Sequence, residues 1–189
     1  MLRTTSLVCC LAILASLFSM TGCRRKPNLA NLKIRQKGSP APDFAARDRN
    51  GSIIRLGNFV ETKHGKPTTP KDLLLVFFAT HCGPCVRELP FLEKYQKENP
   101  KQVQVILIAE ATDDVIEVLD TLLPRNQSGI LVLVDHDERI ADKYFGEMKP
   151  KPFSYYISRK GRVEIFVLGF ATEATSIESE LFKARQRHH

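Results

Sequence analysis

The stretch "FFATHCGPCVREL", residues 77–89, holds two cysteines at the point where a buried strand is predicted to give way to a helix. The unbroken apolar run at 73–80, "LLLVFFAT", is typical of a strand buried on both faces of a sheet. The segment 83–99 has apolar residues at helical spacing and ends before a proline. Cys82 is therefore predicted at the start of a helix, with Cys85 one turn deeper on the same face.

This position suits thiol chemistry. Unpaired amide hydrogens and the positive end of the helix dipole favour the thiolate form of Cys82. Gly83 allows a tight turn, and Pro84 is tolerated in a first turn because its missing N–H would have had no partner there. The pair combines an exposed nucleophile with a sheltered second thiol. Thiol–disulfide exchange requires that asymmetry, so the motif predicts a redox-active pair.

Two alternatives use the same cysteines. The first is a non-enzymatic protein that binds copper or zinc through the same two thiols. Zinc would need two more ligands, from His64, His81 or His136, because neither a second CxxC nor a His-x(3–5)-His pattern follows. The second is a degenerate domain used only for docking, in which the cysteine pair would be inert. The metal content of the reduced protein separates the first alternative from catalysis. We expect neither a metal nor another cofactor.

The flanking sequence alternates strands with helices, which indicates an α/β domain with a partly parallel sheet. An Asn50–Gly51 turn signal centres a hairpin within 38–59, and a polar loop with two prolines follows at 61–72. The remaining predicted strands are 102–109, 129–135, 153–158 and 162–168, and the remaining predicted helices are 112–123 with Thr112 as its cap, 137–146 and 172–187.

The N-terminus is predicted to lie outside this domain. Residues 1–22 have the layout of a secretory signal, with one cation and then an apolar run, although an uncleaved anchor helix is the alternative. Residues 23–37 form a basic linker that suits anionic head groups or serves as a soluble spacer. Residues 38–189 hold 21 cations and 21 acids, so no positive field is expected to attract nucleic acid.

Cysteine usage agrees with an exported redox protein. Of the five cysteines, Cys9 and Cys10 lie in the predicted signal and Cys23 directly follows it. The predicted domain then retains only Cys82 and Cys85. A disulfide between them would close too short a loop to stabilise the fold appreciably. An exported domain with one tight pair indicates redox activity rather than a disulfide framework.

The stretch "FFATHCGPCVRELPFLEKY", with "GSPAPDF" upstream and "KPFSYYISRKG" downstream, resembles thioredoxin-like proteins of the TlpA/ResA type over about residues 38–170. The resemblance implies a thioredoxin fold for 38–189: a three-layer α/β/α arrangement with a mixed sheet and an added N-terminal β-hairpin. It also implies that Cys82 attacks a partner's disulfide and that Cys85 resolves the mixed disulfide. "MTGC", which ends at Cys23, resembles a lipobox and implies acylation of that cysteine, for example with palmitate.

Further site residues follow from the same resemblance. Pro152 matches the family's cis-proline, and Lys151 before it would present its backbone to an extended substrate; an ordinary trans proline is the alternative. Glu88 matches a glutamate that could relay a proton, or it is a solvated helix acid. Val76 stands where ordinary thioredoxins carry a buried acid, and His81 replaces a family tryptophan.

Together these features predict an extracytoplasmic thiol–disulfide oxidoreductase anchored by lipid to a bacterial membrane. The resemblance suggests that it reduces disulfides of exported proteins, as in cytochrome c maturation. A membrane electron-donor protein would then reduce the Cys82–Cys85 disulfide again. No nucleic-acid partner is expected.

Overall fold

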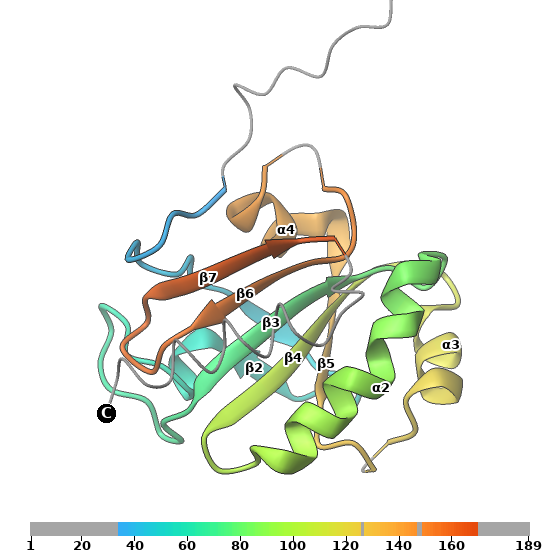
Figure 1. Ribbon diagram of the computed structural model, residues 1–189, viewed down its shortest axis with the longest axis horizontal. Coiled ribbons are helices and arrows are strands. Elements are labelled where there is room, and N and C mark those ends of the chain that lie inside the picture. Colours follow the sequence, from blue (N-terminus) through green and yellow to red (C-terminus); the bar gives the residue numbers. More distant parts are fainter. Residues whose placement is uncertain (1–33, 126, 147–148, 170–189) are drawn as a thin grey trace, which may run out of the picture. The chain divides into compact units, whose positions relative to one another are not determined.

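A five-stranded mixed sheet forms the centre of the fold in the computed structural model, which describes residues 34–125, 127–146 and 149–169 (Figure 1). The strand order is β5-β4-β3-β6-β7; β3, β4 and β5 run parallel, whereas β6 and β7 are antiparallel to their neighbours. The sheet strands are β3 (Asp72–Phe78), β4 (Val103–Glu110), β5 (Leu131–Asp135), β6 (Phe153–Ile157) and β7 (Val163–Leu168). The helices are α2 (Gly83–Glu98), α3 (Val115–Leu122) and α4 (Arg139–Tyr144).

The central strand β3 is buried along its whole length, as its apolar run predicts. Successive side chains of a strand point to opposite faces, so β3 supplies two hydrophobic cores at once. One core contains Leu73, Leu75 and Phe77, and the other contains Leu74, Val76 and Phe78.

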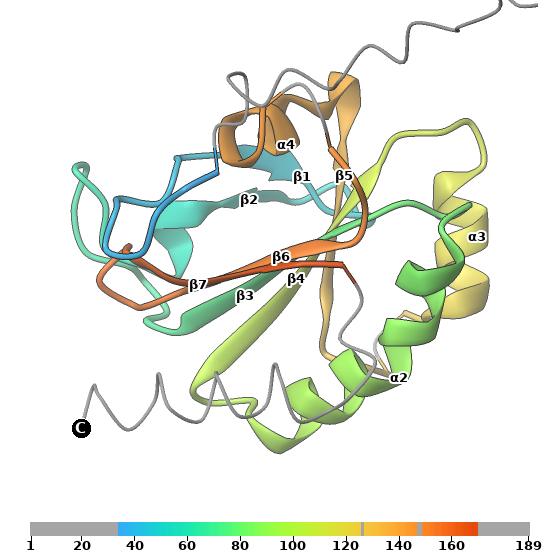
Figure 2. The same ribbon diagram turned by 45° about the horizontal axis from the view of Figure 1, so that its top comes forward.

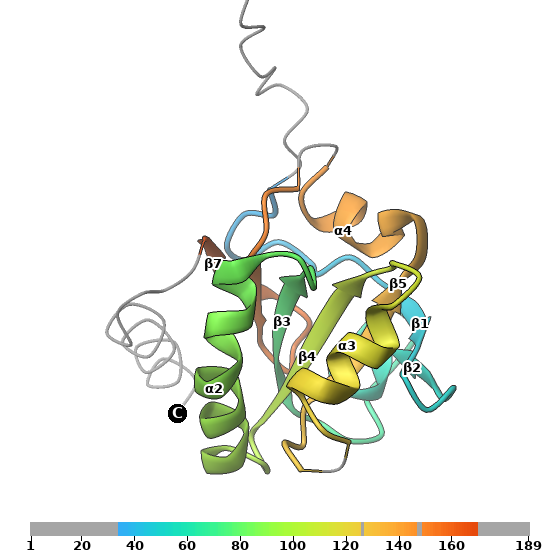
Figure 3. The same cartoon turned by 90° about the vertical axis from the view of Figure 1, so that its right-hand side faces the viewer.

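Helices cover both faces of the sheet (Figures 2 and 3). Residues of α2 and α3, such as Leu92 and Leu119, pack in one core, and residues of α4, such as Tyr144, pack in the other. The second face is also covered by the antiparallel hairpin of β1 (Ala45–Arg47) and β2 (Ile53–Arg55). The predicted α/β/α layers, mixed sheet and N-terminal hairpin are confirmed, while the predicted helix 172–187 lies outside the described residues.

The hairpin is held to the body of the domain by a buried arginine at its turn. The side chain of Arg49 is 5% exposed and pairs with Asp120 at 3.2 Å. Its guanidinium also donates to the carbonyl oxygen of Leu123 at 2.6 Å, just beyond the end of α3. Helix ends leave carbonyls without intrahelical partners, so this cation satisfies one of them while it docks the hairpin.

Two predicted helix starts are wrong. The helix predicted at 112–123 begins only at Val115. The hydroxyl of Thr112 donates to the carboxylate of Asp114 at 2.8 Å instead of capping the helix. The segment predicted as helix from 137 begins as a 3₁₀ turn, His136–Glu138, and α4 starts only at Arg139. Short polar side chains bond locally in several ways, so a cap is not set by sequence alone.

The predicted signal and the proposed lipid site at Cys23 lie outside the described residues. The last part of the predicted linker is described and contacts the domain: Ile34 packs against the core, and the backbone N–H of Arg35 donates to the Tyr155 hydroxyl at 3.1 Å. Tight packing therefore begins before residue 38. Within the described ranges, none of the helices is both long and apolar enough to cross a membrane.

The loop 61–72 lies at the opposite end of β3 from the cysteines. The backbone N–H of Glu61 donates to the carbonyl of Arg159, in the turn between β6 and β7, at 2.8 Å. Gly161 in that turn has a φ of +69°, and a Cβ atom there would lie 2.2 Å from the carbonyl oxygen of Glu61. The loop thus packs against a turn that tolerates only glycine, and it does not border Cys82.

Candidate active site

Cys82 is the N-cap residue of α2, at the end of the short turn that follows β3. Its backbone is extended, and its sulfur accepts a hydrogen bond from the backbone N–H of Cys85 at 3.3 Å. Pro84 lies in the first turn of the helix, where its missing N–H costs nothing. The sulfur of Cys82 therefore lies at the positive end of the helix dipole, where a thiolate is stabilised.

The two cysteines form a disulfide and differ in exposure. Cys85 is 1% exposed and belongs to the core beneath α2, whereas Cys82 is half-buried at the surface. An external thiol or disulfide can therefore approach Cys82 only. Exchange through a mixed disulfide requires one accessible sulfur and one sheltered sulfur, and this pair provides both.

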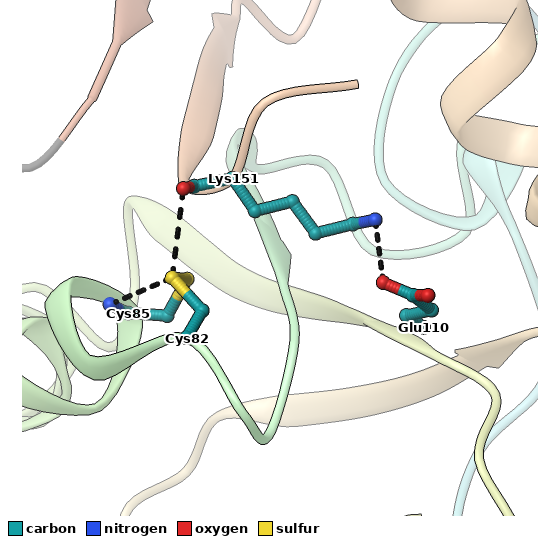
Figure 4. The surroundings of a disulfide bond; sticks show 4 residues. All are labelled: Cys82, Cys85, Glu110 and Lys151. Carbon is teal, nitrogen blue, oxygen red and sulfur yellow. Dashed lines mark hydrogen bonds and ion pairs between the residues drawn. A yellow bond between two sulfur atoms is a disulfide. The ribbon is translucent and has the colours of Figure 1, made fainter. Parts of the chain in front are cut away.

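The Lys151–Pro152 peptide bond is cis, in the loop that leads into β6. Since β6 pairs antiparallel with β3 and Phe153 lies opposite Phe77, the start of β6 meets the end of β3 at one edge of the sheet. The carbonyl oxygen of Lys151 lies 3.5 Å from the sulfur of Cys82 (Figure 4). A disulfide sulfur carries no proton, so this contact becomes a hydrogen bond only when Cys82 is a thiol.

Glu88 is buried one turn beyond Cys85 in α2, with 2% of its surface exposed. Its Oε2 atom has no hydrogen-bond partner. Burial disfavours the charged form and raises the pKa of Glu88 to about 7. The interpretation of Glu88 as a solvated acid is therefore wrong. Val76, where ordinary thioredoxins carry a buried acid, is itself fully buried and apolar.

Other buried carboxylates in the described ranges have structural partners. Asp72 accepts a hydrogen bond from the hydroxyl of Tyr156 at 2.8 Å, and Asp135 accepts one from the backbone N–H of Ile140 at 2.9 Å. Both are thus used in holding the fold. Buried polar atoms are normally paired, so the unpartnered oxygen of Glu88 marks it as a candidate for proton transfer.

A metal centre would need more donors than the pair supplies. The described part of the chain gathers no group of three or more histidine, cysteine, aspartate or glutamate side chains suited to a metal. His81, next to Cys82, is exposed. Structural zinc takes four protein ligands and catalytic zinc usually three, so the described donor set does not fit a zinc site.

The side chain of Lys151 was missed by the sequence analysis, which assigned a role only to its backbone. Its ammonium pairs with Glu110 at the end of β4 and with Glu138 just after β5 (Figure 4 shows the first pair). A signal existed: the carboxyl ends of parallel strands meet at one edge of a sheet, and acids follow both of these strands. The cation that they hold lies in "KPKP", residues 149–152.

Comparisons with known proteins agree with this geometry. The family model described as Redoxin matches residues 36–163. Thiol-disulfide oxidoreductase ResA of Bacillus thuringiensis (strain Al Hakam) is 30% identical over 142 residues, which cover 73% of this chain and 73% of that protein. ResA of Bacillus subtilis (strain 168) is 28% identical over 138 residues, 73% of this chain and 70% of the relative.

Among solved structures, a putative thiol:disulfide interchange protein DsbE from Chlorobium tepidum superimposes with a TM-score of 0.65 at 25% identity. The match covers 79% of this chain and 98% of that one. The fold, the disulfide at the start of α2 and the cis-proline beside it therefore accompany a sequence match over most of the described domain. The chain belongs to the Redoxin family and, within it, to the ResA-like thiol–disulfide oxidoreductases.

Proposed function

We propose that this protein is a membrane-tethered, extracytoplasmic reductant of disulfides in exported proteins. The observation that carries the proposal is the half-buried sulfur of Cys82 at the N-cap of α2, bonded to buried Cys85 and facing the carbonyl of Lys151. The resemblance to TlpA/ResA-type proteins supports exported substrates, such as proteins of cytochrome c maturation. A membrane protein that carries a dithiol would restore the reduced state.

The proposed cycle conserves electrons and protons. The Cys82 thiolate attacks one sulfur of the partner's disulfide; a mixed disulfide forms, and the other partner sulfur leaves as a thiolate. Cys85 then loses its proton and attacks the sulfur of Cys82. The second partner sulfur leaves, and the Cys82–Cys85 disulfide remains. Two electrons pass to the partner, and its two thiolates take up two protons.

Glu88 is proposed as the acceptor of the Cys85 proton. Residues three apart on a helix are neighbours on its surface, which places the two side chains within reach directly or through one water. A group with a pKa of about 7 is partly ionised at neutral pH and can both take and return a proton. Val76 offers no alternative acid in the core.

The reducing direction predicts a low midpoint potential. A cysteine pair is a strong oxidant when its reduced form is strongly stabilised. Here Gly83 and Pro84 place no charged side chain between the cysteines, and the carbonyl of Lys151 disfavours a negative charge on the sulfur of Cys82. The reduced form therefore lacks such strong stabilisation. Equilibration with glutathione is expected to give a potential more negative than about −200 mV. Pro84→His, which adds an ionisable donor beside the sulfur, should raise it. A wild-type value near that of DsbA, about −120 mV, would refute the reducing assignment.

The tether is proposed from the sequence before the domain. The signal-like residues 1–22, the lipobox-like "MTGC" and the basic stretch up to Lys37 support an acylated Cys23 beside an anionic membrane. Cys23→Ser is expected to shift most of the protein from the membrane fraction and to abolish incorporation of labelled palmitate. Cys9→Ser, in the predicted signal, is the control and should change neither result. Unaltered membrane association and labelling in Cys23→Ser would contradict the tether.

A further inference from the structure

Five charged side chains form a continuous ionic chain beside the cis-proline loop. In order they are Asp142, Lys149, Glu138, Lys151 and Glu110. Lys149 pairs with Asp142 at 2.7 Å and with one carboxylate oxygen of Glu138 at 2.9 Å. Lys151 pairs with the other oxygen of Glu138 at 2.5 Å and with Glu110 at 2.7 Å. The ionic chain links four parts of the fold: α4, the 3₁₀ turn before it, the cis-proline loop and the end of β4.

Both lysines are largely removed from water. The side chain of Lys151 is 10% exposed and that of Lys149 is 13% exposed. Burying an ammonium group is costly unless charged partners surround it, and here each ammonium has two carboxylates. Exposed ion pairs, such as Lys94–Glu98 on α2, constrain their side chains little by comparison. The ionic chain therefore restrains where these two lysines can lie.

The strained backbone around Glu138 allows its carboxylate to take part in the ionic chain. Asp137 and Glu138 have φ values of +57° and +51°, in the left-handed region that non-glycine residues rarely adopt. With this backbone, both carboxylate oxygens of Glu138 reach a lysine of the loop. Such strain persists only where the surrounding structure enforces it, and it is concentrated at functional sites.

The loop has few other anchors. Pro150 and Pro152 have no backbone N–H to donate. Among the described residues, the only backbone–backbone hydrogen bond made by 149–152 runs from the N–H of Gly169 to the carbonyl of Pro152, at 2.8 Å. Besides buried Pro152, the two ion pairs of the Lys151 side chain are therefore the main polar restraints on the Lys151 backbone. That side chain extends away from the disulfide toward Glu110, while its carbonyl faces Cys82 (Figure 4).

We propose that the ionic chain makes Lys151 a positioning residue: through Glu110 and Glu138 it holds the backbone before Pro152 at the distance from Cys82 that an extended polypeptide substrate needs. This inference rests on the proposed thiol–disulfide exchange. It implies a preference for polypeptide disulfides over small ones, because a small disulfide needs only the sulfur of Cys82, whereas a peptide also needs the fixed backbone beside it.

The test compares two substrates on the full chain in detergent: a linear peptide that carries a glutathione mixed disulfide, and the small aromatic disulfide 5,5′-dithiobis(2-nitrobenzoate). For Lys151→Met, the ratio of the peptide rate constant to the small-disulfide rate constant is expected to fall about tenfold, mainly through a higher KM for the peptide. Lys94→Met, which removes only an exposed ion pair, is the matched control and should keep the wild-type ratio.

A double-mutant cycle tests whether the residues of the ionic chain act as one unit. Lys151→Met combined with Glu138→Gln should lower the ratio no further than Lys151→Met alone, because either change breaks the same connection. If Lys151→Met does not fold, Glu110→Gln leaves Lys151 paired with Glu138 and should still lower the ratio about threefold.

An unchanged ratio in a folded variant, or fully additive losses in the cycle, would overturn the positioning role. The proposed exchange function is tested separately within the same experiment. If the wild-type chain reacts with neither disulfide, that function fails, whatever the variants do.

Discussion

Replacing Cys85 by serine is expected to arrest the protein as stable mixed disulfides with its partners. Cys82 keeps its place at the N-cap of α2 and still attacks a partner's disulfide, but no second thiol remains to release the product. Turnover with a disulfide substrate should fall to background. Non-reducing gels of membrane extracts should show covalent adducts that disappear with reductant, and mass spectrometry of the adducts would identify the partners.

The matched control is Cys82→Ser. It retains Cys85, which is 1% exposed, so both exchange and adduct formation should be lost. The two single variants therefore separate attack from resolution, although each removes one thiol of the same pair. Adducts formed equally by both variants would contradict the assignment of Cys82 as the attacking sulfur. A Cys85→Ser protein that forms no adducts in cells would argue against catalysis itself.

Replacing Glu88 by glutamine is expected to slow the resolution step about 100-fold near neutral pH, within the usual range for loss of a general base. Glutamine keeps the size of the side chain but cannot accept a proton. Ionised Glu88 is the proposed base and its pKa is about 7, so the wild-type rate should rise with pH around 7. In Glu88→Gln this inflection should disappear. Stopped-flow measurement of product release from a preformed mixed disulfide reports this step alone.

The same substitution has a consequence for stability. The pKa of Glu88 is about 7 in the folded protein and 4.5 in a model compound, so between these values the folded state holds a proton that the unfolded chain has lost. Stability should therefore fall as pH rises from 4.5 to 7 and level off above 7. Through Glu88, the free energy of unfolding should fall by about 3 kcal/mol over this pH range. Glu88→Gln should not show this fall. Urea unfolding of the oxidised protein at pH 5 and pH 8 measures the difference.

Glu98→Gln is the control for both measurements, because Glu98 lies on the same helix with 57% of its side chain exposed. It should change neither the pH profile nor the pH dependence of unfolding. If Glu88→Gln kept the wild-type inflection near pH 7, the proton would pass to another group. If it kept the same slope of stability with pH, the raised pKa would be refuted.

Much of the fold was predictable because its signals are local. Residues 73–79, shortly before Cys82, are apolar at every position, which indicates a strand buried on both faces, and β3 is buried along its whole length. The turn at Asn50–Gly51 centres a hairpin, as predicted. Cys82 at the N-cap follows from the same kind of local reading, because cap geometry and the i, i+3 spacing to Cys85 depend only on neighbouring residues.

The sequence by itself therefore determined the layers of the fold, the cysteine pair at the start of α2 and, through a family resemblance, the cis peptide bond before Pro152. Only the tertiary structure decided that Glu88 is buried with an unpaired oxygen, and that Lys151 is held by Glu110 and Glu138. The physical reason is that burial and ion pairing depend on which distant segments the sheet brings to one edge. Periodicity and caps report only on the nearest few residues.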